Sequence, residues 1–237
     1  MRFARPLVEG ILLRRYRRFL ADVQLADGRE VTAHVPNTGA MAGVSTPGCR
    51  VWLSEATQSH RKTAYTWELS TSDEGTLVAV NTGLANRLAA ESIEMGLLPS
   101  LHGFGQVHQE VRLDNGSSRI DMVLHGEQGR CWAEVKSVTL ARHGVALFPD
   151  AVTLRGQKHL RELMALSRKG ERAAMIFCIQ RNDVRAFFPA ESIDPDYAHL
   201  LRGAARAGVQ IHSFRNEVTT AGVTPEAPVP VSLETPP

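Results

Sequence analysis

The chain has 237 residues, enough for one large domain or two small ones, and its 43% apolar composition is ordinary for a globular protein. Its three cysteines lie far apart without a CxxC pair, which argues against a disulfide framework or a zinc knuckle and suits a reducing cytosol. The longest apolar run, Ala173–Ile179, is too short to span a bilayer, and no apolar core of signal-peptide length precedes the N-terminal arginines. We therefore expect a cytoplasmic protein with no membrane partner.

The net charge is only +2, but basic residues are concentrated near the N-terminus. Residues 1–20 hold six arginines and a single acid, Glu9. Such a strip is typical either of a phosphate-binding surface or of a solvated strand face, and its charge alone does not separate the two.

Residues 1–80 show the alternation of short β-strands. Val23 and Leu25 alternate with polar neighbours, Asp27–Gly28 is typical of a hairpin turn, and the alternation resumes at Val31. About five such strands predict a small antiparallel barrel, for which an OB-fold is one choice and an SH3-like barrel another.

Residues 81–218 predict an α/β domain, because helical patterns alternate with buried strands. A first helix follows Asn81 and ends at Gly96, and a second covers Thr153–Gly170. Asp194–Pro195 is typical of the start of a third helix. The remaining segment, 219–237, holds five of the twelve prolines, and we expect it to be disordered.

A hairpin in this domain carries unexpected charges. With its turn centred between Glu127 and Gln128, the antiparallel register places Asp121 directly opposite Glu134 on one face of the sheet. Like charges repel there, and burial would raise at least one pKa. A divalent cation between the two carboxylates removes this conflict, and two carboxylates plus water are the usual protein share of a Mg²⁺ site.

Lys136 lies on the same face as Glu134, since side chains two apart on a strand share a face. Its ammonium could orient a metal-activated water and offset charge on a phosphate. Glu91, at the edge of the first helix's apolar stripe, is the candidate third carboxylate. The alternative is an exposed Glu134–Lys136 ion pair, with Asp121 in a turn.

Several stretches together resemble the sugar fermentation stimulation protein A (SfsA) family over nearly the whole chain except the proline-rich end. The stretches are HVPNTGAM (His34–Met41), VNTGLANRLAAE (Val80–Glu91), SSRIDMVL (Ser117–Leu124), EVKSVTL (Glu134–Leu140), FPDAVTLRGQKHLRELM (Phe148–Met164) and IDPDYAHLL (Ile193–Leu201).

This resemblance implies a two-domain α+β protein, an N-terminal OB-like β-barrel followed by an α/β domain of the PD-(D/E)xK nuclease superfamily. It implies DNA binding with little sequence preference and a regulatory role in sugar, notably maltose, metabolism. Asp121, Glu134 and Lys136 match the superfamily's metal-binding acids and catalytic lysine, with Glu91 as the helix acid and Mg²⁺ or Mn²⁺ as the cofactor. Ile120 stands where the motif's name has proline.

The family is described by DNA binding rather than by cleavage, so enzymatic activity stays open. A non-catalytic DNA-binding or regulatory protein on a nuclease fold is one alternative, and a metal-dependent enzyme acting on RNA or a small phosphoester is another. Nuclease-fold proteins often dimerise, which leaves a homodimer open. The candidate DNA-binding residues are Arg14, Arg15, Arg17, Arg18, Arg61, Lys62, Arg155 and Lys158.

Overall fold

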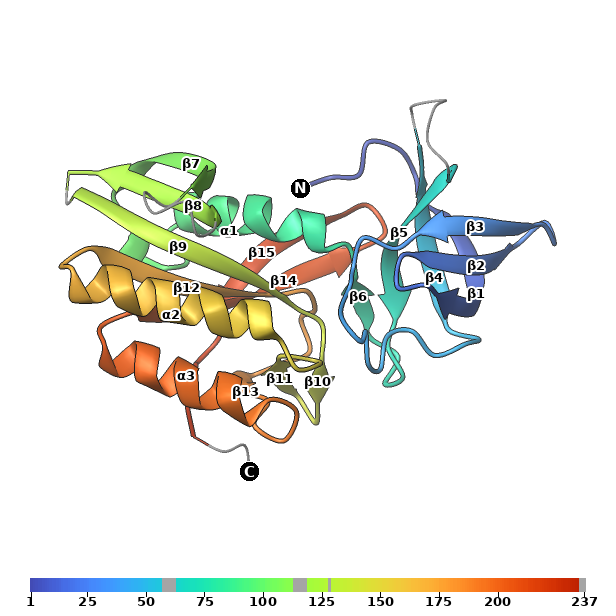
Figure 1. The fold of residues 1–237 in the computed structure, drawn as a ribbon. Coiled ribbons are helices and arrows are strands. Elements are labelled where there is room, and N and C mark those ends of the chain that lie inside the picture. Colours follow the sequence, from blue (N-terminus) through green and yellow to red (C-terminus); the bar gives the residue numbers. More distant parts are fainter. Residues whose placement is uncertain (57–62, 113–118, 128, 235–237) are drawn as a thin grey trace.

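The computed structural model describes residues 1–56, 63–112, 119–127 and 129–234, which form a β-barrel beside an α/β domain (Figure 1). Five strands make the barrel in the order β3-β2-β1-β4-β5, and parallel pairing of β3 with β5 closes it. A short sixth strand pairs antiparallel with β5. The strands are β1 (Val8–Tyr16), β2 (Leu20–Leu25), β3 (Glu30–His34), β4 (Arg50–Glu55), β5 (Tyr65–Thr71) and β6 (Leu77–Ala79).

The barrel forms because alternate residues of its strands point inward. Val23 and Leu25 on β2 are buried, whereas Gln24 between them is exposed, as a period of two requires. Trp67 on β5 is fully buried in the same core. The predicted OB-like β-barrel is therefore confirmed.

A mixed six-stranded sheet forms the second domain, in the order β15-β14-β12-β9-β8-β7. The central strand β12 runs parallel to both β9 and β14, and it is buried along almost its whole length. This is the both-sides-covered strand that its apolar sequence predicts. The strands are β7 (Phe104–Arg112), β8 (Arg119–Gly126), β9 (Gly129–Val138), β12 (Arg172–Ile179), β14 (Gln210–Thr219) and β15 (Gly222–Pro228).

Helices cover both faces of this sheet, α1 on one face and the adjacent α2 and α3 on the other (Figure 1). A small side sheet in the order β10-β11-β13 lies beyond the end of β9. The predicted α/β domain is thus confirmed. The remaining elements are η1 (Thr82–Leu84), α1 (Ala85–Glu94), η2 (Pro99–Leu101), β10 (Ala141–Arg142), β11 (Val145–Phe148), α2 (Leu154–Arg168), β13 (Ala186–Pro189) and α3 (Pro195–Arg206).

The C-terminal segment differs from its expectation. Residues 219–237 were expected to be disordered, but Gly222–Pro228 forms β15, which pairs with β14 at the edge of the sheet. An edge strand tolerates proline because the missing N–H can face away from the ladder, so Pro225 and Pro228 do not prevent pairing. Residues 235–237 lie outside the described part.

The N-terminus contributes to the second domain as well. The Met1 amino group donates to the Val223 carbonyl at 2.6 Å, and Val223 N donates back to the Met1 carbonyl at 2.9 Å. Gly222 is required at this approach, because a Cβ there would lie 2.4 Å from the Met1 carbonyl oxygen. Met1 is therefore joined to β15 at one edge of the sheet.

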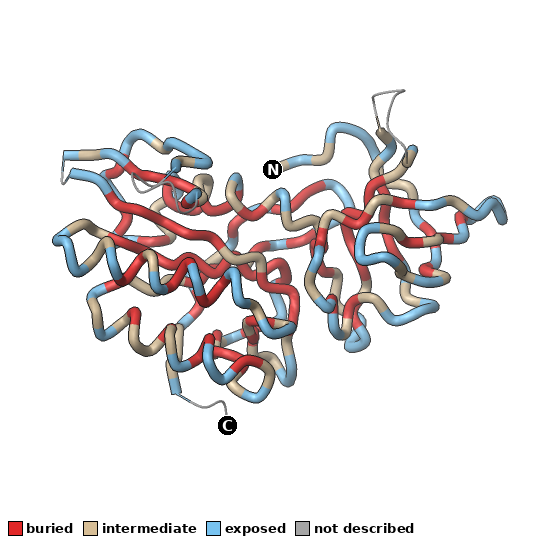
Figure 2. Tube along the Cα trace, in the orientation of Figure 1, coloured by how far each residue is buried: buried red, intermediate tan, exposed pale blue. Residues whose placement is uncertain are grey.

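The two domains share part of a core. Trp52 of β4 and Leu69 of β5 belong to the same buried cluster as Leu88 of α1 and Met122 of β8. Figure 2 shows burial continuing from the strands of the barrel into the sheet of the second domain. None of the helices that the structure describes has the length and apolar character needed to cross a membrane.

Asp194 joins α2 to α3, and its removal should destabilise the fold. Its buried carboxylate caps α3 by accepting from Tyr197 N at 2.9 Å, and it also accepts from Thr153 N at 2.8 Å and Gln157 Nε2 at 3.0 Å. We expect Asp194→Ala to lower the free energy of unfolding by about 2–4 kcal/mol, because a helix cap is lost and buried donors remain unpaired.

Urea unfolding measures this change as a lower midpoint with an unchanged slope. The control is Asp196→Ala, an exposed acid in the first turn of the same helix, which should cost less than about 1 kcal/mol. Equal losses in the two variants would contradict the role assigned to Asp194.

Candidate active site

A cavity of about 1020 Å³ lies between the barrel and the α/β domain. Asp121 and Lys136 line it from the sheet, and residues 82–83 and 85–87 line it from η1 and the start of α1. The opposite wall comes from the barrel, through the loop residues 37–40. Both domains are therefore needed to form this cavity.

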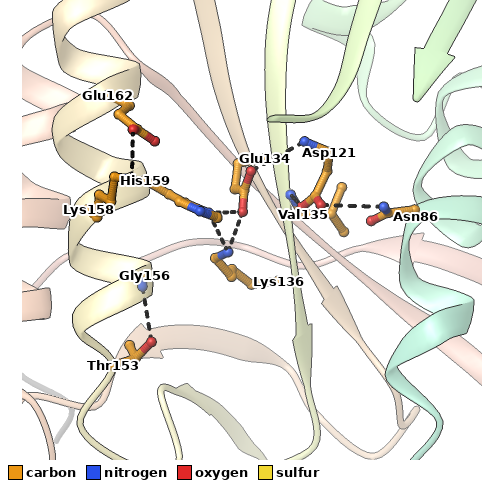
Figure 3. Close-up of polar contacts among 10 residues, drawn as sticks. All are labelled: Asn86, Asp121, Glu134, Val135, Lys136, Thr153, Gly156, Lys158, His159 and Glu162. Carbon is orange, nitrogen blue, oxygen red and sulfur yellow. Dashed lines mark hydrogen bonds and ion pairs between the residues drawn. The ribbon is translucent and has the colours of Figure 1, made fainter. Parts of the chain in front are cut away.

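The hairpin β8–β9 has the register that the turn predicts. Met122 pairs with Ala133, and Gly126 pairs with Gly129. At the next position along the hairpin, Val135 N donates at 2.9 Å to a side-chain oxygen, Asp121 Oδ2, instead of to a backbone carbonyl. Asp121 N points toward Glu134 Oε2 at 3.4 Å, so the two acids lie across the ladder from each other (Figure 3).

Glu134 is buried and held by two basic side chains. Lys136 Nζ donates to Glu134 Oε1 at 2.5 Å, and His159 Nδ1 of α2 contacts the same oxygen (Figure 3). The Glu134 side chain is only 1% exposed, whereas that of Lys136 is 15% exposed and reaches the cavity. The alternative interpretation of an exposed ion pair is therefore wrong, and Asp121 lies in a strand rather than a turn.

The pKa values of these two neighbouring carboxyl groups, Asp121 and Glu134, are shifted in opposite directions. Burial raises the pKa of Asp121 above its usual range, and the negative charge of Glu134 raises it further. Burial also favours a higher pKa for Glu134, but the charge of Lys136 and the contact with His159 outweigh it and lower that pKa to about 2. Glu134 is thus a stable anion, while the negative charge of Asp121 is only partly compensated.

The first helix supplies an amide instead of the expected acid. Asn86 Nδ2 lies 3.5 Å from Asp121 Oδ1. Glu91 points elsewhere, since its carboxylate pairs with the Met1 amino group at 3.2 Å and with Arg87 Nε at 3.1 Å. Among the residues that the structure describes, no three His, Cys, Asp or Glu side chains form a cluster suited to a metal ion.

The candidate basic residues divide into two groups. Arg15, Arg18 and Arg155 line the cavity. Arg14, which pairs with Asp22, Arg17, which is exposed at a hairpin turn, and Lys158, which pairs with Glu162 on α2, do not line it. Arg61 and Lys62 lie outside the described residues.

Arg15 lines the cavity and also holds the neighbouring barrel loop in place. Its guanidinium donates to the carbonyls of Asn37, Gly39 and Ala40 at 2.8–3.2 Å, which fixes the barrel loop that lines the cavity. Asp150 of the second domain accepts from Met41 N of the same loop at 2.8 Å. This loop is therefore anchored from both domains.

His159 is the main site residue that sequence reasoning did not place beside the acids. Its position four residues before Leu163 put it on the apolar face of α2, and this spacing was the available signal. A buried histidine facing a strand with Glu134 requires a polar partner, which the carboxylate supplies.

Neutralising Asp121 should stabilise the metal-free protein. Its folded-state pKa is raised, so its ionised form opposes folding at neutral pH, and this cost disappears below the unfolded-state pKa. We expect Asp121→Asn to raise the free energy of unfolding in EDTA by about 0.5–2 kcal/mol, as is common when function has been kept at the expense of stability.

Urea unfolding of wild type and variant at neutral pH measures this difference. Asp22→Asn is the opposite control. Burial favours a higher pKa for Asp22, but hydrogen bonds from Arg14, Thr32 and Tyr16 lower it, so neutralising this acid should reduce stability. A clear loss of stability in Asp121→Asn would show that its charge is fully compensated without a cation.

Comparison with known proteins supports one family for the whole chain. Residues 13–80 match the model of the SfsA N-terminal OB domain, and residues 83–222 match that of the sugar fermentation stimulation protein RE domain. A sugar fermentation stimulation protein homolog from Geobacter metallireducens is 53% identical over 233 residues, covering 98% of this chain and 100% of the relative. The homolog from Thioalkalivibrio sulfidiphilus is 51% identical over 234 residues, covering 98% of each chain.

A solved structure agrees with these matches. The structure of Pyrococcus furiosus SfsA in complex with Ca²⁺ superposes with a TM-score of 0.87 at 31% identity, covering 98% of each chain. The similarity therefore extends over both domains and includes their arrangement. The chain belongs to the sugar fermentation stimulation protein (SfsA) family.

Proposed function

We propose that this protein binds DNA, with little sequence preference, in the cavity between its domains and hydrolyses a phosphodiester there with the help of Mg²⁺ or Mn²⁺. One observation carries the proposal. The acids Asp121 and Glu134 and the cavity-lining Lys136 meet at the sheet side of a cavity whose walls present arginines from both domains.

The side chains present are compatible with a hard divalent cation. Two carboxylates lie across one ladder, and the pKa of Asp121 is raised by burial and by the charge of Glu134. Mg²⁺ is commonly bound by one or two carboxylates together with waters and substrate phosphate, so a third acid is not required. The Pyrococcus furiosus relative is described in complex with Ca²⁺, another cation that prefers oxygen ligands, which supports this assignment.

When bound, such a cation polarises a phosphoryl oxygen and lowers the pKa of a coordinated water. The protein's own groups orient the two carboxylates and offset charge on the phosphate. Val135 N and Asn86 hold the Asp121 carboxylate toward the cavity, and His159 steadies Glu134 from the helix side. Lys136 reaches the cavity from the same face as Glu134, where its ammonium offsets negative charge that develops on the phosphate.

Binding with little sequence preference follows from the chemistry of the walls. Arg18 and Arg155 are exposed cations on opposite walls, and cations of this kind contact phosphates, which are the same in every sequence. A regulatory role in sugar, notably maltose, metabolism would depend on this DNA binding.

The second candidate is a DNA-binding protein that performs no chemistry. It is favoured by the absence of Glu91 from the cavity and by the occupation of Glu134 Oε1 by both Lys136 and His159. A further candidate is a metal-dependent enzyme that acts on RNA or a small phosphoester, because the same set of donor side chains would serve it.

Plasmid nicking tests the hydrolysis directly. In Mn²⁺ or Mg²⁺ we expect the wild type to nick supercoiled plasmid and to leave it intact in EDTA. Asp121→Ala and Lys136→Ala should each lose at least about a hundredfold in rate, because each removes a group that acts on the transition state. Parallel assays with RNA and a chromogenic phosphodiester identify the preferred substrate.

Glu91→Gln is the informative companion variant. Its carboxylate pairs with Met1 and Arg87, so we expect nicking within a few-fold of wild type. A loss of nicking rate as large as that of Asp121→Ala would show that Glu91 belongs to the metal site. If the wild-type protein binds plasmid but cuts no substrate in either metal, hydrolysis is excluded and the non-catalytic DNA-binding protein is the function that remains.

A further inference from the structure

The turn between β1 and β2 presents an unusual group of side chains. Arg17, Arg18 and Phe19 form a three-residue turn between the paired residues Tyr16 and Leu20. Phe19 is 49% exposed, and both arginines beside it are exposed as well. Arg17 and Arg18 also have φ values of 49° and 62°, a region that residues other than glycine seldom adopt.

This turn is held firmly at the edge of the cavity. Val35 N donates to the Phe19 carbonyl at 2.7 Å, and Arg15 Nη2 donates to the Arg18 carbonyl at 3.1 Å. The Arg18 side chain itself lines the cavity. The backbone carbonyls of Arg18 and Phe19 are thus both fixed, and Phe19 is exposed next to a cavity-lining cation.

The opposite edge of the cavity repeats this combination. Val152 and Leu154 flank Thr153, the N-cap of α2, and are 65% and 74% exposed. Val152 lines the cavity, as does Arg155. Of the five large apolar side chains that are exposed in the described residues, Val152 lines the cavity, and Phe19 and Leu154 are each next in sequence to an arginine that lines it.

Resting on the proposed DNA binding, we propose that the cavity takes single-stranded DNA, with an unpaired base stacked on Phe19. An exposed aromatic ring beside cations is the combination that binds unpaired strands, because every base offers a π-face and every nucleotide a phosphate. Val152 and Leu154 cover the bases from the other edge, while Arg18 and Arg155 contact the backbone.

Two further facts favour a single strand over a duplex. The cavity volume of about 1020 Å³ is close to the range of roughly 300–1,000 Å³ of pockets that enclose a small ligand, so a few nucleotides match it better than a whole helix. The bases of a duplex are also stacked on each other and offer no free face to Phe19. The arginines on both edges favour a polyanion over an apolar protein partner.

Binding of labelled oligonucleotides in EDTA tests this proposal. The probes are a short single strand, the duplex of the same sequence, and an abasic single strand of the same length. Wild type should bind the single strand more tightly than the duplex or the abasic strand. Phe19→Ala should weaken single-strand binding by roughly 5- to 100-fold, the loss expected for one stacked base, and leave the other two affinities unchanged.

Met95→Ala is the matched control, because Met95 is 54% exposed at the end of α1 and neither it nor its sequence neighbours line the cavity, whereas Arg18 beside Phe19 does. It should bind all three probes like wild type. The slope of log K against log salt should be the same in Phe19→Ala and wild type, since no phosphate contact is removed.

Phe19→Trp supplies a direct signature of stacking. Its added indole fluorescence should be quenched by the single strand and not by the abasic strand, with affinity close to wild type.

The outcomes separate this inference from the function on which it rests. Wild-type protein that binds none of the probes would refute DNA binding itself. Equal affinity for single strand, duplex and abasic strand, unchanged in Phe19→Ala, would leave DNA binding intact and overturn the stacked single strand. An equal loss for all three probes in Phe19→Ala would also overturn it, because only a base-dependent loss reports stacking.

Discussion

The contact between the buried Glu134 carboxylate and the two side chains that hold it, Lys136 and His159, is the interaction on which this site depends. It fixes β9 relative to α2, because Glu134 and Lys136 come from β9 and His159 comes from α2. On the other side of Glu134, Asp121 of β8 adds a negative charge that burial makes costly. A cation would stabilise this arrangement, and the proposed function follows from that imbalance.

The arrangement is useful only because the two domains are fastened together. The barrel loop beside Arg15 is tied to Asp150, and on a neighbouring surface the buried Arg181 pairs with Asp183 at 2.6 Å and reaches Glu74 of the barrel at 3.3 Å. Thr76 of the barrel also donates to Asp183 at 2.6 Å. A buried arginine needs such partners, and breaking them would leave an uncompensated charge. The cavity therefore has walls of defined position, which suits the proposed alignment of a phosphate with two acids.

The features predicted well from sequence were those with local causes. The position of the hairpin turn set the register that brings Asp121 and Glu134 together, and Asp194–Pro195 started α3 as its capping chemistry requires. The errors concern partners distant in sequence. Glu91 is neutralised by the Met1 amino group, 90 residues away, and no pattern within α1 could reveal that pairing. The ordered C-terminal segment and the edge strand β7 were missed because edge strands expose polar residues or prolines, which removes the usual alternation.

The most direct test of the central claim is a calorimetric titration of Mn²⁺ into metal-free protein, with and without a short single-stranded oligonucleotide. We expect one binding event per chain in wild type, strengthened by the oligonucleotide because phosphate completes the ligand set. The event should disappear in Asp121→Asn and remain in Glu91→Gln. Binding that is unchanged in Asp121→Asn, or absent from wild type under both conditions, would contradict the assignment of these buried charges to a metal.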